Sequence, residues 1–191
     1  MENISVIGIA GRIGSGKDHL ANYLKNTYFQ DAVLMSFADQ LKLHCMFKAN
    51  PTSITNTDKI YKTYFHSKPP EVRKQIQEYG CNARESNEEI WINMLYAQML
   101  MLKDRGITTF IIPDVRFENE RDFIKSIGGK IIKVVAPTRN NEATKHLSDE
   151  SRYHLSESFV DSMECYIIIN NDIHQNFEKN VQEAMLLINL K

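Results

Sequence analysis

The sequence is poor in cysteine and has no long apolar run. Its three cysteines, Cys45, Cys81 and Cys165, are far apart and form no C-x-x-C pair, which excludes the usual spacing of a disulfide framework or a zinc site. No stretch approaches the roughly 18 uninterrupted apolar residues of a membrane-spanning helix, and no basic segment precedes the first apolar run. These absences favour a reducing compartment, and we expect a cytoplasmic protein with no membrane partner.

An excess of either charge is also absent. The 191 residues include 23 basic and 24 acidic side chains, which gives a net charge of −1. Sequence-independent binding of nucleic acid needs a basic surface, so we expect no nucleic-acid partner and favour small phosphorylated ligands. Apolar residues make up 42% of the chain, a share that is typical of a single folded domain of this length.

The most informative motif is Gly11-Arg12-Ile13-Gly14-Ser15-Gly16-Lys17-Asp18. It follows an apolar run of strand type and precedes residues with helical spacing, which is the context that a phosphate-binding loop requires. The glycines let the backbone approach phosphates, and Lys17 adds a positive charge for the β- and γ-phosphates. A glycine turn with a solvated lysine is the alternative interpretation. Asp18 replaces the hydroxyl residue of the usual pattern, so it could hold magnesium directly or through water.

Short apolar runs alternate with stretches of helical spacing along most of the chain. This alternation predicts an α/β fold in which a five-stranded parallel sheet carries helices on both faces. The expected strands lie within residues 4–9, 32–35, 109–112, 131–135 and 165–169. The expected helices lie at 18–28, from 36 onward, and at 72–79, 90–102, 118–127 and 177–188.

A first interruption of this alternation covers residues 49–70. The stretch is polar and rich in turn residues, so we predict an inserted loop region there. The helix after it is expected to stop at Gly80. Ser86 and Glu89 have the spacing of a capping box that opens the helix over 90–102, and this helix is apolar nearly all round, which predicts that it is buried.

A second interruption covers residues 137–163, which are polar with only patchy apolar positions. We predict a mobile cover that brings Arg139 and Arg152 onto transferring phosphates when it closes. His146 and His154 lie in the same stretch, but they do not form an H-x-x-x-H pair. Metal binding by these histidines is therefore not favoured.

Charged residues follow the second and third expected strands. Asp39 and Lys42 are three residues apart, so they share one face of the next helix near the carboxyl end of its strand, the edge where open α/β sheets bind ligands. Asp39 could instead cap the helix while Lys42 is a solvated charge. Asp114 ends the third strand, where a carboxylate can hold magnesium or its water, and Arg116 can reach phosphate oxygens.

Other charged residues allow two interpretations. Arg73 and Arg84 flank the expected turn at Gly80, and an arginine there suits bidentate recognition of a monophosphate. Either could also be an ordinary surface arginine. Glu118 and Glu120 begin the helix after the third strand, and we expect them mainly to complement the helix dipole.

With these residues assembled, the chain resembles the deoxynucleoside monophosphate kinases of the phosphate-loop superfamily, a group typical of phages and large viruses. The likeness runs over most of the chain. It is carried by Gly16-Lys17-Asp18, by Phe37-Ala38-Asp39 with Leu41-Lys42, by Pro113-Asp114-Val115-Arg116 with Asn119-Glu120, and by His154-Leu155-Ser156-Glu157 with Asn170-Asn171.

The resemblance implies a three-layer P-loop NTPase fold of the nucleoside monophosphate kinase type, as one domain with a substrate-binding insertion at about 50–100 and a lid at about 137–160. It implies an ATP-dependent phosphotransferase that converts a deoxynucleoside monophosphate to the diphosphate. If the chain is viral, the location is the host cytoplasm. His19 stands where the family commonly has Thr, and Gly80-Cys81-Asn82 replaces its usual Gly-Thr-acid motif.

We predict the following division of the site. ATP is bound at Arg12, Gly14, Ser15, Gly16, Lys17, Asp18 and His19. The acceptor nucleotide is bound at Asp39, Lys42, Arg84, Asp114, Arg116 and Glu120. Lys17, Arg116 and Arg139 act in catalysis, and Asp18 and Asp114 are the candidate Mg²⁺ ligands.

Two other functions stay open at this point. A kinase of another small phosphorylated metabolite, such as dephospho-coenzyme A, would share the loop, lid and sheet. A binding module that uses ATP as a switch would share the loop alone. The expected partners are ATP and a deoxynucleoside monophosphate, and a homodimer is compatible with the resemblance.

Overall fold

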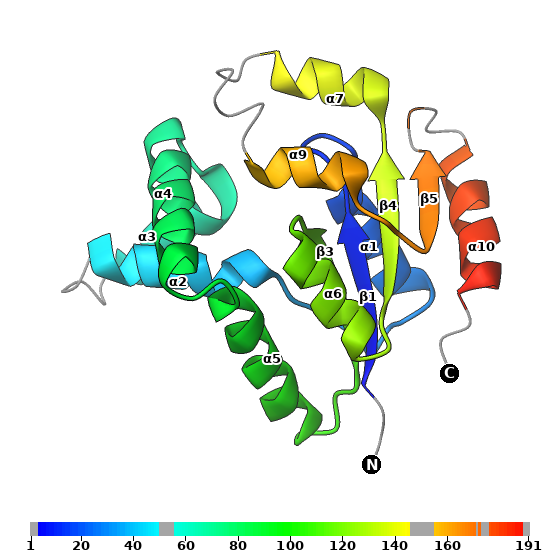
Figure 1. The fold of residues 1–191 in the computed structure, drawn as a ribbon, viewed down its shortest axis with the longest axis horizontal. Helices are drawn as coiled ribbons and strands as arrows, with labels where there is room; N and C mark the ends of the chain where they lie inside the picture. Colours follow the sequence, from blue (N-terminus) through cyan, green and yellow to red (C-terminus); the bar gives the residue numbers. More distant parts are fainter. Residues whose placement is uncertain (1–3, 50–55, 146–154, 171, 173–175, 189–191) are drawn as a thin grey trace. The chain divides into compact units, whose positions relative to one another are not determined.

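The computed structural model describes residues 4–49, 56–145, 155–170, 172 and 176–188 (Figure 1). The chain divides into two compact units. Unit 1 consists of Met1–Met35 together with Met99–Lys191, and unit 2 consists of Ser36–Gln98.

Unit 1 is built on a parallel sheet that has five strands in the described residues, as the sequence predicts. The strand order is β2-β3-β1-β4-β5, and every neighbouring pair is parallel. Helices cover the central strands, so most residues of these strands are apolar. The strands are β1 (Ser5–Ala10), β2 (Val33–Leu34), β3 (Thr109–Val115), β4 (Lys130–Val135) and β5 (Ile167–Asn170).

Helices lie on both faces of this sheet (Figure 1). On one face, α1 (Lys17–Thr27) and α10 (Phe177–Leu187) share a core with the strands. On the other face lies α6 (Glu118–Ser126), where a Cβ atom on Gly8 would lie 2.7 Å from Cδ1 of Ile124. Gly8 therefore lets α6 approach the sheet closely, and the predicted three-layer arrangement is confirmed.

The predicted polar cover contains two helices in its described part. These are α7 (Pro137–Thr144), which follows β4, and α9 (Leu155–Ser162), which precedes β5 (Figure 1). Val160 and Met163 are buried. The end of α9 is therefore packed within unit 1.

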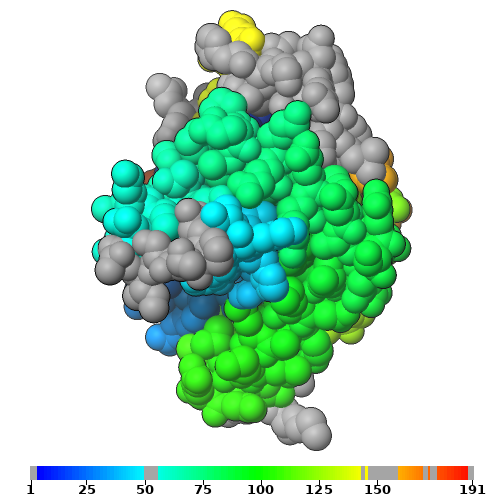
Figure 2. All heavy atoms as spheres, turned by 90° about the vertical axis from the view of Figure 1, so that its left-hand side faces the viewer, coloured from blue at the N-terminus to red at the C-terminus, as the bar shows by residue number. Residues whose placement is uncertain are grey.

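Unit 2 is helical. It contains α2 (Phe37–Ala49), α3 (Thr57–Lys62), the π-helical turn η2 (Thr63–Ser67), α4 (Pro70–Ser86) and the first part of α5 (Ile90–Lys103). Figure 2 shows one face of this unit, on which α2 in light blue lies beside η2 and α4 in cyan to green.

Two expectations for unit 2 are wrong. The predicted loop region contains α3 and η2. The sequence shows no helical period there because α3 buries no residue and η2 buries only Tyr64. The helix expected to stop at Gly80 continues to Ser86. Ser86 therefore ends α4 and does not cap α5. Before α5 begins, the backbone N–H of Glu89 donates to the side-chain oxygen of Asn87 at 3.1 Å.

Gly80 serves helix packing and does not form a turn. A Cβ atom at this position would lie 2.9 Å from Cδ2 of Leu41, so the glycine lets α4 approach α2. The carbonyl of Gly80 also lies 3.5 Å from the indole nitrogen of Trp91. A glycine inside a helix costs stability relative to alanine, and close packing explains why one stands here.

The expected burial of α5 holds for one side of the helix. Trp91, Leu95 and Met99 are buried, whereas Leu100 and Met101 are exposed. No helix in the described part of the chain is long and apolar enough to cross a bilayer.

Candidate functional site

The segment between β1 and α1 has the geometry of a phosphate loop. β1 ends at Ala10, and α1 begins at Lys17 with Gly16 as its N-terminal cap residue. Gly14 and Gly16 have φ angles of 80° and 91°, which residues with a side chain rarely adopt. The loop therefore leads into the amino end of a helix, where backbone N–H groups and the helix dipole favour an anion.

Gly11 is required for a different reason. A Cβ atom on it would lie 2.4 Å from Oγ of Ser15 and 2.9 Å from the carbonyl oxygen of Val134, so no larger residue fits. The backbone N–H of Ser15 donates to the carbonyl of Arg12 at 3.1 Å, which closes the turn. The loop is thus tightly folded against the end of β4.

Lys17, Asp18 and His19 form the first turn of α1. Lys17 is buried, with 8% of its surface exposed, whereas Asp18 and His19 are exposed. The imidazole of His19 packs against the ring of Phe177 in α10, with 4.7 Å between centroids. His19 therefore contributes to the packing of α10 on α1, and its predicted role in ATP binding stays a prediction.

Asp114 lies at the edge of the sheet where the loop begins. The pairing between β1 and β3 shifts register after Gly8, so that Ala10, the last residue of β1, pairs with Val115. Pro113 lies within this irregularity, where its missing N–H is tolerated. Asp114 precedes Val115, so the loop and this half-buried carboxylate share the carboxyl edge of two neighbouring strands.

Glu120 holds the turn that carries Arg116. Its carboxylate oxygen Oε2 accepts the backbone N–H of Arg116 at 2.8 Å and that of Phe117 at 3.1 Å. Glu120 is only 2% exposed, whereas Glu118 is exposed and faces Arg121 at 3.9 Å. The two glutamates were expected to have the same role, but their burial and contacts differ. Glu120 binds specific backbone groups and Glu118 lies on the surface.

We expect Glu120→Gln to lower the free energy of unfolding by about 1 to 2 kcal/mol, because a buried charge-assisted hydrogen bond to the backbone becomes a neutral one. Glu118→Gln is the matched control and should change stability by less than about 0.5 kcal/mol, since exposed charges contribute little. Urea unfolding of the two variants measures the difference. Equal stabilities would mean that Glu120 does not hold this turn.

Arg139 connects α7 to the phosphate loop. The carboxylate of Asp172 accepts the backbone N–H and hydroxyl of Thr138 at 3.1 and 3.2 Å, which fixes the start of α7. The Arg139 guanidinium then donates to the carbonyl of Ser15 at 3.0 Å. Its Nε is buried and has no hydrogen-bond partner among the described residues. An anion held by the loop would satisfy this donor.

The predicted acceptor residues of unit 2 are ordered by local contacts. Asp39 and Lys42 form an ion pair at 2.9 Å, and Asp39 also accepts the backbone N–H of Ser36 at 3.1 Å. Asp39 therefore caps α2 as well as pairing with Lys42. The ammonium of Lys42 lies 5.1 Å from the ring centroid of Phe65, so its side chain is not simply a solvated charge.

The two arginines of α4 differ in exposure. Arg73 is exposed, and its Nε donates to the carbonyl of Lys68 at 2.9 Å. Arg84 lies half-buried in the last turn of α4. The glycine turn expected beside them is absent because the described residues around Gly80 are helical, so any phosphate contact by Arg84 comes from a helix.

Several predicted positions cannot be placed. Arg152, His146 and His154 lie outside the described residues, as does Asn171. The side chains of Leu155, Ser156, Glu157 and Asn170 also lie outside them.

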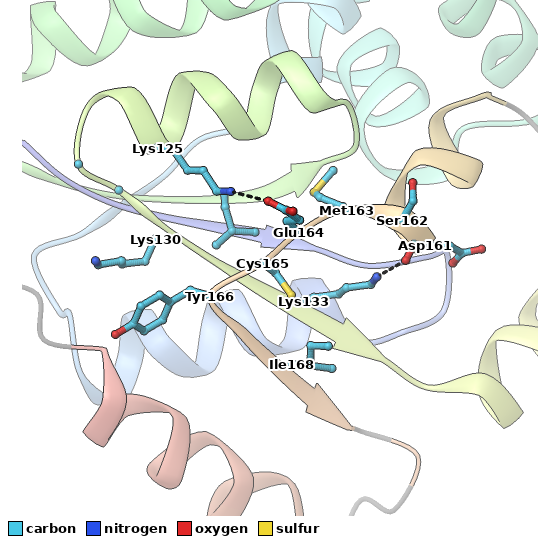
Figure 3. A pocket seen from close by; sticks show the side chains of 13 residues that line it. Lys125, Lys130, Lys133, Asp161, Ser162, Met163, Glu164, Cys165, Tyr166 and Ile168 are labelled. Atoms are coloured by element: carbon cyan, nitrogen blue, oxygen red, sulfur yellow. Dashed lines mark hydrogen bonds and ion pairs between the residues drawn. The ribbon is translucent and has the colours of Figure 1, made fainter.

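A groove of about 770 Å³ lies elsewhere in unit 1, beside the carboxyl end of α9 (Figure 3). Its described lining comes from the end of α6 and the turn after it, from β4, and from residues 161–166 and 168, and it includes no predicted site residue. Cys165 lies in the groove, and burial raises the pKa of its thiol. A thiol with a raised pKa is protonated at neutral pH, so Cys165 is not an activated nucleophile.

The carboxylates of Asp114 and Asp18 suit a magnesium ion that is shared with substrate phosphates better than a metal ion whose ligands all come from the protein. Within the described part of the chain, no group of three or more His, Cys, Asp or Glu side chains is placed to hold a metal ion. Mg²⁺ is usually bound through one or two carboxylates together with substrate phosphates. Asp114 and the exposed Asp18 offer the hard oxygen donors that this mode of binding needs.

Comparisons with solved structures agree with the fold. The Thermus thermophilus protein TT1252 matches with a TM-score of 0.52 and 15% identity over the whole of both chains. A sugar kinase from Janibacter sp. matches with a TM-score of 0.52 and 16% identity, over 98% of this chain and 95% of the other.

Comparisons of sequence identify the family as well as the fold. A protein of Acanthamoeba polyphaga mimivirus, with the provisional name deoxynucleotide monophosphate kinase, is 27% identical over 200 residues, which cover 92% of this chain and 93% of that protein. The family model for deoxynucleotide monophosphate kinase matches residues 28–181. This range contains the Asp114 turn and Arg139 but not the phosphate loop. The chain belongs to the deoxynucleotide monophosphate kinase family.

Proposed function

We propose that this protein transfers the γ-phosphate of ATP to a deoxynucleoside monophosphate and releases the deoxynucleoside diphosphate and ADP. One observation carries the proposal: the loop at Gly11–Gly16 has the geometry of a phosphate-binding loop. The family match covers residues 28–181 and does not include this loop. The loop therefore supports a nucleoside triphosphate site independently of the family match.

ATP is proposed to bind through the loop backbone and Lys17. The amides around Gly14, Ser15 and Gly16 lie at the amino end of α1, which favours the phosphates. Lys17 follows directly, and its position at the start of the helix suits contact with the β- and γ-phosphates. Arg139 already donates to the Ser15 carbonyl, and its buried Nε donor suits a phosphate oxygen.

The acceptor is proposed to bind through Asp39, Lys42, Arg84 and Arg116. Lys42 and the two arginines provide the positive charge that a monophosphate needs. Glu120 acts in this scheme by holding the Arg116 backbone. The insertion at about 50–100 would enclose the base, and the lid at about 137–160 would cover the phosphates.

Catalysis is proposed to depend on alignment and charge. The transition state of phosphoryl transfer is loose, so the protein mainly positions the two nucleotides and stabilises the negative charge. Lys17, Arg116 and Arg139 supply that stabilisation. Mg²⁺, held by Asp114 with Asp18 as a second candidate, would neutralise phosphate charge when it is bound. Closure of the lid would exclude water as a competing acceptor.

A coupled ADP-release assay across the deoxy- and ribonucleoside monophosphates tests the proposal. We expect ADP release to depend on an added deoxynucleoside monophosphate. Dephospho-coenzyme A serves as the competing acceptor, and faster turnover with it would assign the protein to another metabolite. ATP consumption that never depends on an acceptor would instead favour a nucleotide-switched binding module. The same panel reports the preferred base and sugar.

A further inference from the structure

We infer that Asp161 is a positioning residue for the phosphate loop, acting through Arg12. This inference rests on the proposed use of the loop for ATP. Arg12 is the second residue of the loop, and its Nε donates to Oδ1 of Asp161 at 2.8 Å. A second nitrogen of the same guanidinium donates to Oδ2. The pair is therefore bidentate, which fixes the orientation of the guanidinium as well as its position.

The backbone of Asp161 is held in place by a residue of the sheet. Its backbone carbonyl accepts a hydrogen bond of 2.6 Å from the ammonium of Lys133, a residue of β4 that is 9% exposed. Figure 3 shows this contact at the edge of the groove beside α9. The neighbours Val160 and Met163 are buried. The last turn of α9 is thus anchored to the sheet, and the Asp161 carboxylate is a fixed point for Arg12.

This anchoring reaches the part of the loop that would bind phosphates. The carbonyl of Arg12 accepts the backbone N–H of Ser15 at 3.1 Å, and the carbonyl of Ser15 accepts the Arg139 guanidinium at 3.0 Å. Asp161 in α9 and Arg139 in α7 therefore both contact the loop, from two helices of the predicted cover. An exposed ion pair alone adds little stability, so its main effect is to keep the loop in one conformation.

The neighbouring ion pair between Lys125 and Glu164 provides a matched control. It joins α6 to the chain just after α9 by a contact of 3.7 Å, and neither of its residues belongs to the phosphate loop (Figure 3). The Glu164 side chain is 84% exposed. Removing its charge tests for any general effect of a carboxylate in this segment.

The experiment is a double-mutant cycle on the binding of a non-hydrolysable ATP analogue, measured by calorimetry. Asp161→Asn and Arg12→Gln should each weaken binding by about fivefold to tenfold, within the coupling found between contacting residues. The double variant should bind no more weakly than either single variant. Asp161→Glu should restore part of the affinity, and Glu164→Gln should bind as the wild type does. In steady state, KM for ATP should rise more than kcat falls.

The result that overturns the inference is an unchanged dissociation constant in Asp161→Asn, or additive effects in the double variant. Lower thermal stability of Asp161→Asn with normal analogue binding would likewise assign Asp161 to structure alone. Failure of the proposed function looks different, because the wild type would then bind the analogue but phosphorylate no deoxynucleoside monophosphate.

Discussion

Lys17→Met is expected to lower kcat by at least about 100-fold, because removing one preorganised group that stabilises charge in a transition state costs roughly 10²- to 10³-fold. Lys17 opens α1 directly after the glycine loop and is 8% exposed. Methionine preserves most of the buried hydrocarbon stem and removes only the ammonium. The fold should therefore survive, and the loss should be visible as slower ADP release at saturating ATP and acceptor.

Lys25→Met is the control for this change. Lys25 lies in the last turn of the same helix, whose first turn follows the loop. Its variant should turn over as the wild type does, and both variants should unfold at similar temperatures. A Lys17→Met enzyme with nearly normal kcat would remove Lys17 from the mechanism, and a lower unfolding temperature would mean that the charge has a structural role.

The sheet and the loop could be predicted because each rests on short-range sequence patterns. A parallel strand that is covered on both faces is mainly apolar, so β3 and β4 are recognisable from Phe110-Ile111-Ile112 and from Ile131, Ile132, Val134 and Val135. The loop needs glycine at Gly14 and Gly16 for positive φ angles and at Gly11 for space. These glycines lie within a few residues of one another, so the loop can be recognised from a short stretch of sequence.

The features that escaped prediction depend on contacts between distant residues. Gly80 is the residue type that commonly ends a helix, yet α4 continues to Ser86, and the close approach of Leu41 explains why a glycine stands inside the helix. Glu120 and Glu118 look alike until burial separates them. Asp161 meets Arg12 across 149 residues of sequence, and no local signal marks either as the partner of the other. Glu120 accepts the Phe117 N–H as the third residue of a capping box does, but a phenylalanine side chain cannot accept a hydrogen bond, so the Ser/Thr-x-x-Glu signature of the box is missing from the sequence.

Asp114→Asn is expected to reduce kcat by about 10²- to 10³-fold, equivalent to roughly 3 to 4 kcal/mol of transition-state stabilisation. Asn keeps the size of the side chain and one oxygen but loses the negative charge that favours a hard cation. The change occurs beside the register shift that brings the end of β3 next to the start of the loop. We therefore expect the variant to need a higher Mg²⁺ concentration for half-maximal rate.

Asp104→Asn separates this effect from the general loss of one negative charge. Asp104 is exposed and precedes β3, whereas Asp114 lies near its carboxyl end. Titrating Mg²⁺ at fixed ATP should leave the control unchanged and shift the Asp114→Asn curve to higher concentration. An Asp114→Asn enzyme that is slow but has an unaltered Mg²⁺ requirement would point to the acceptor as the partner of Asp114. A variant with normal kcat would exclude both roles, because a carboxylate that contacts either group must affect the transfer step.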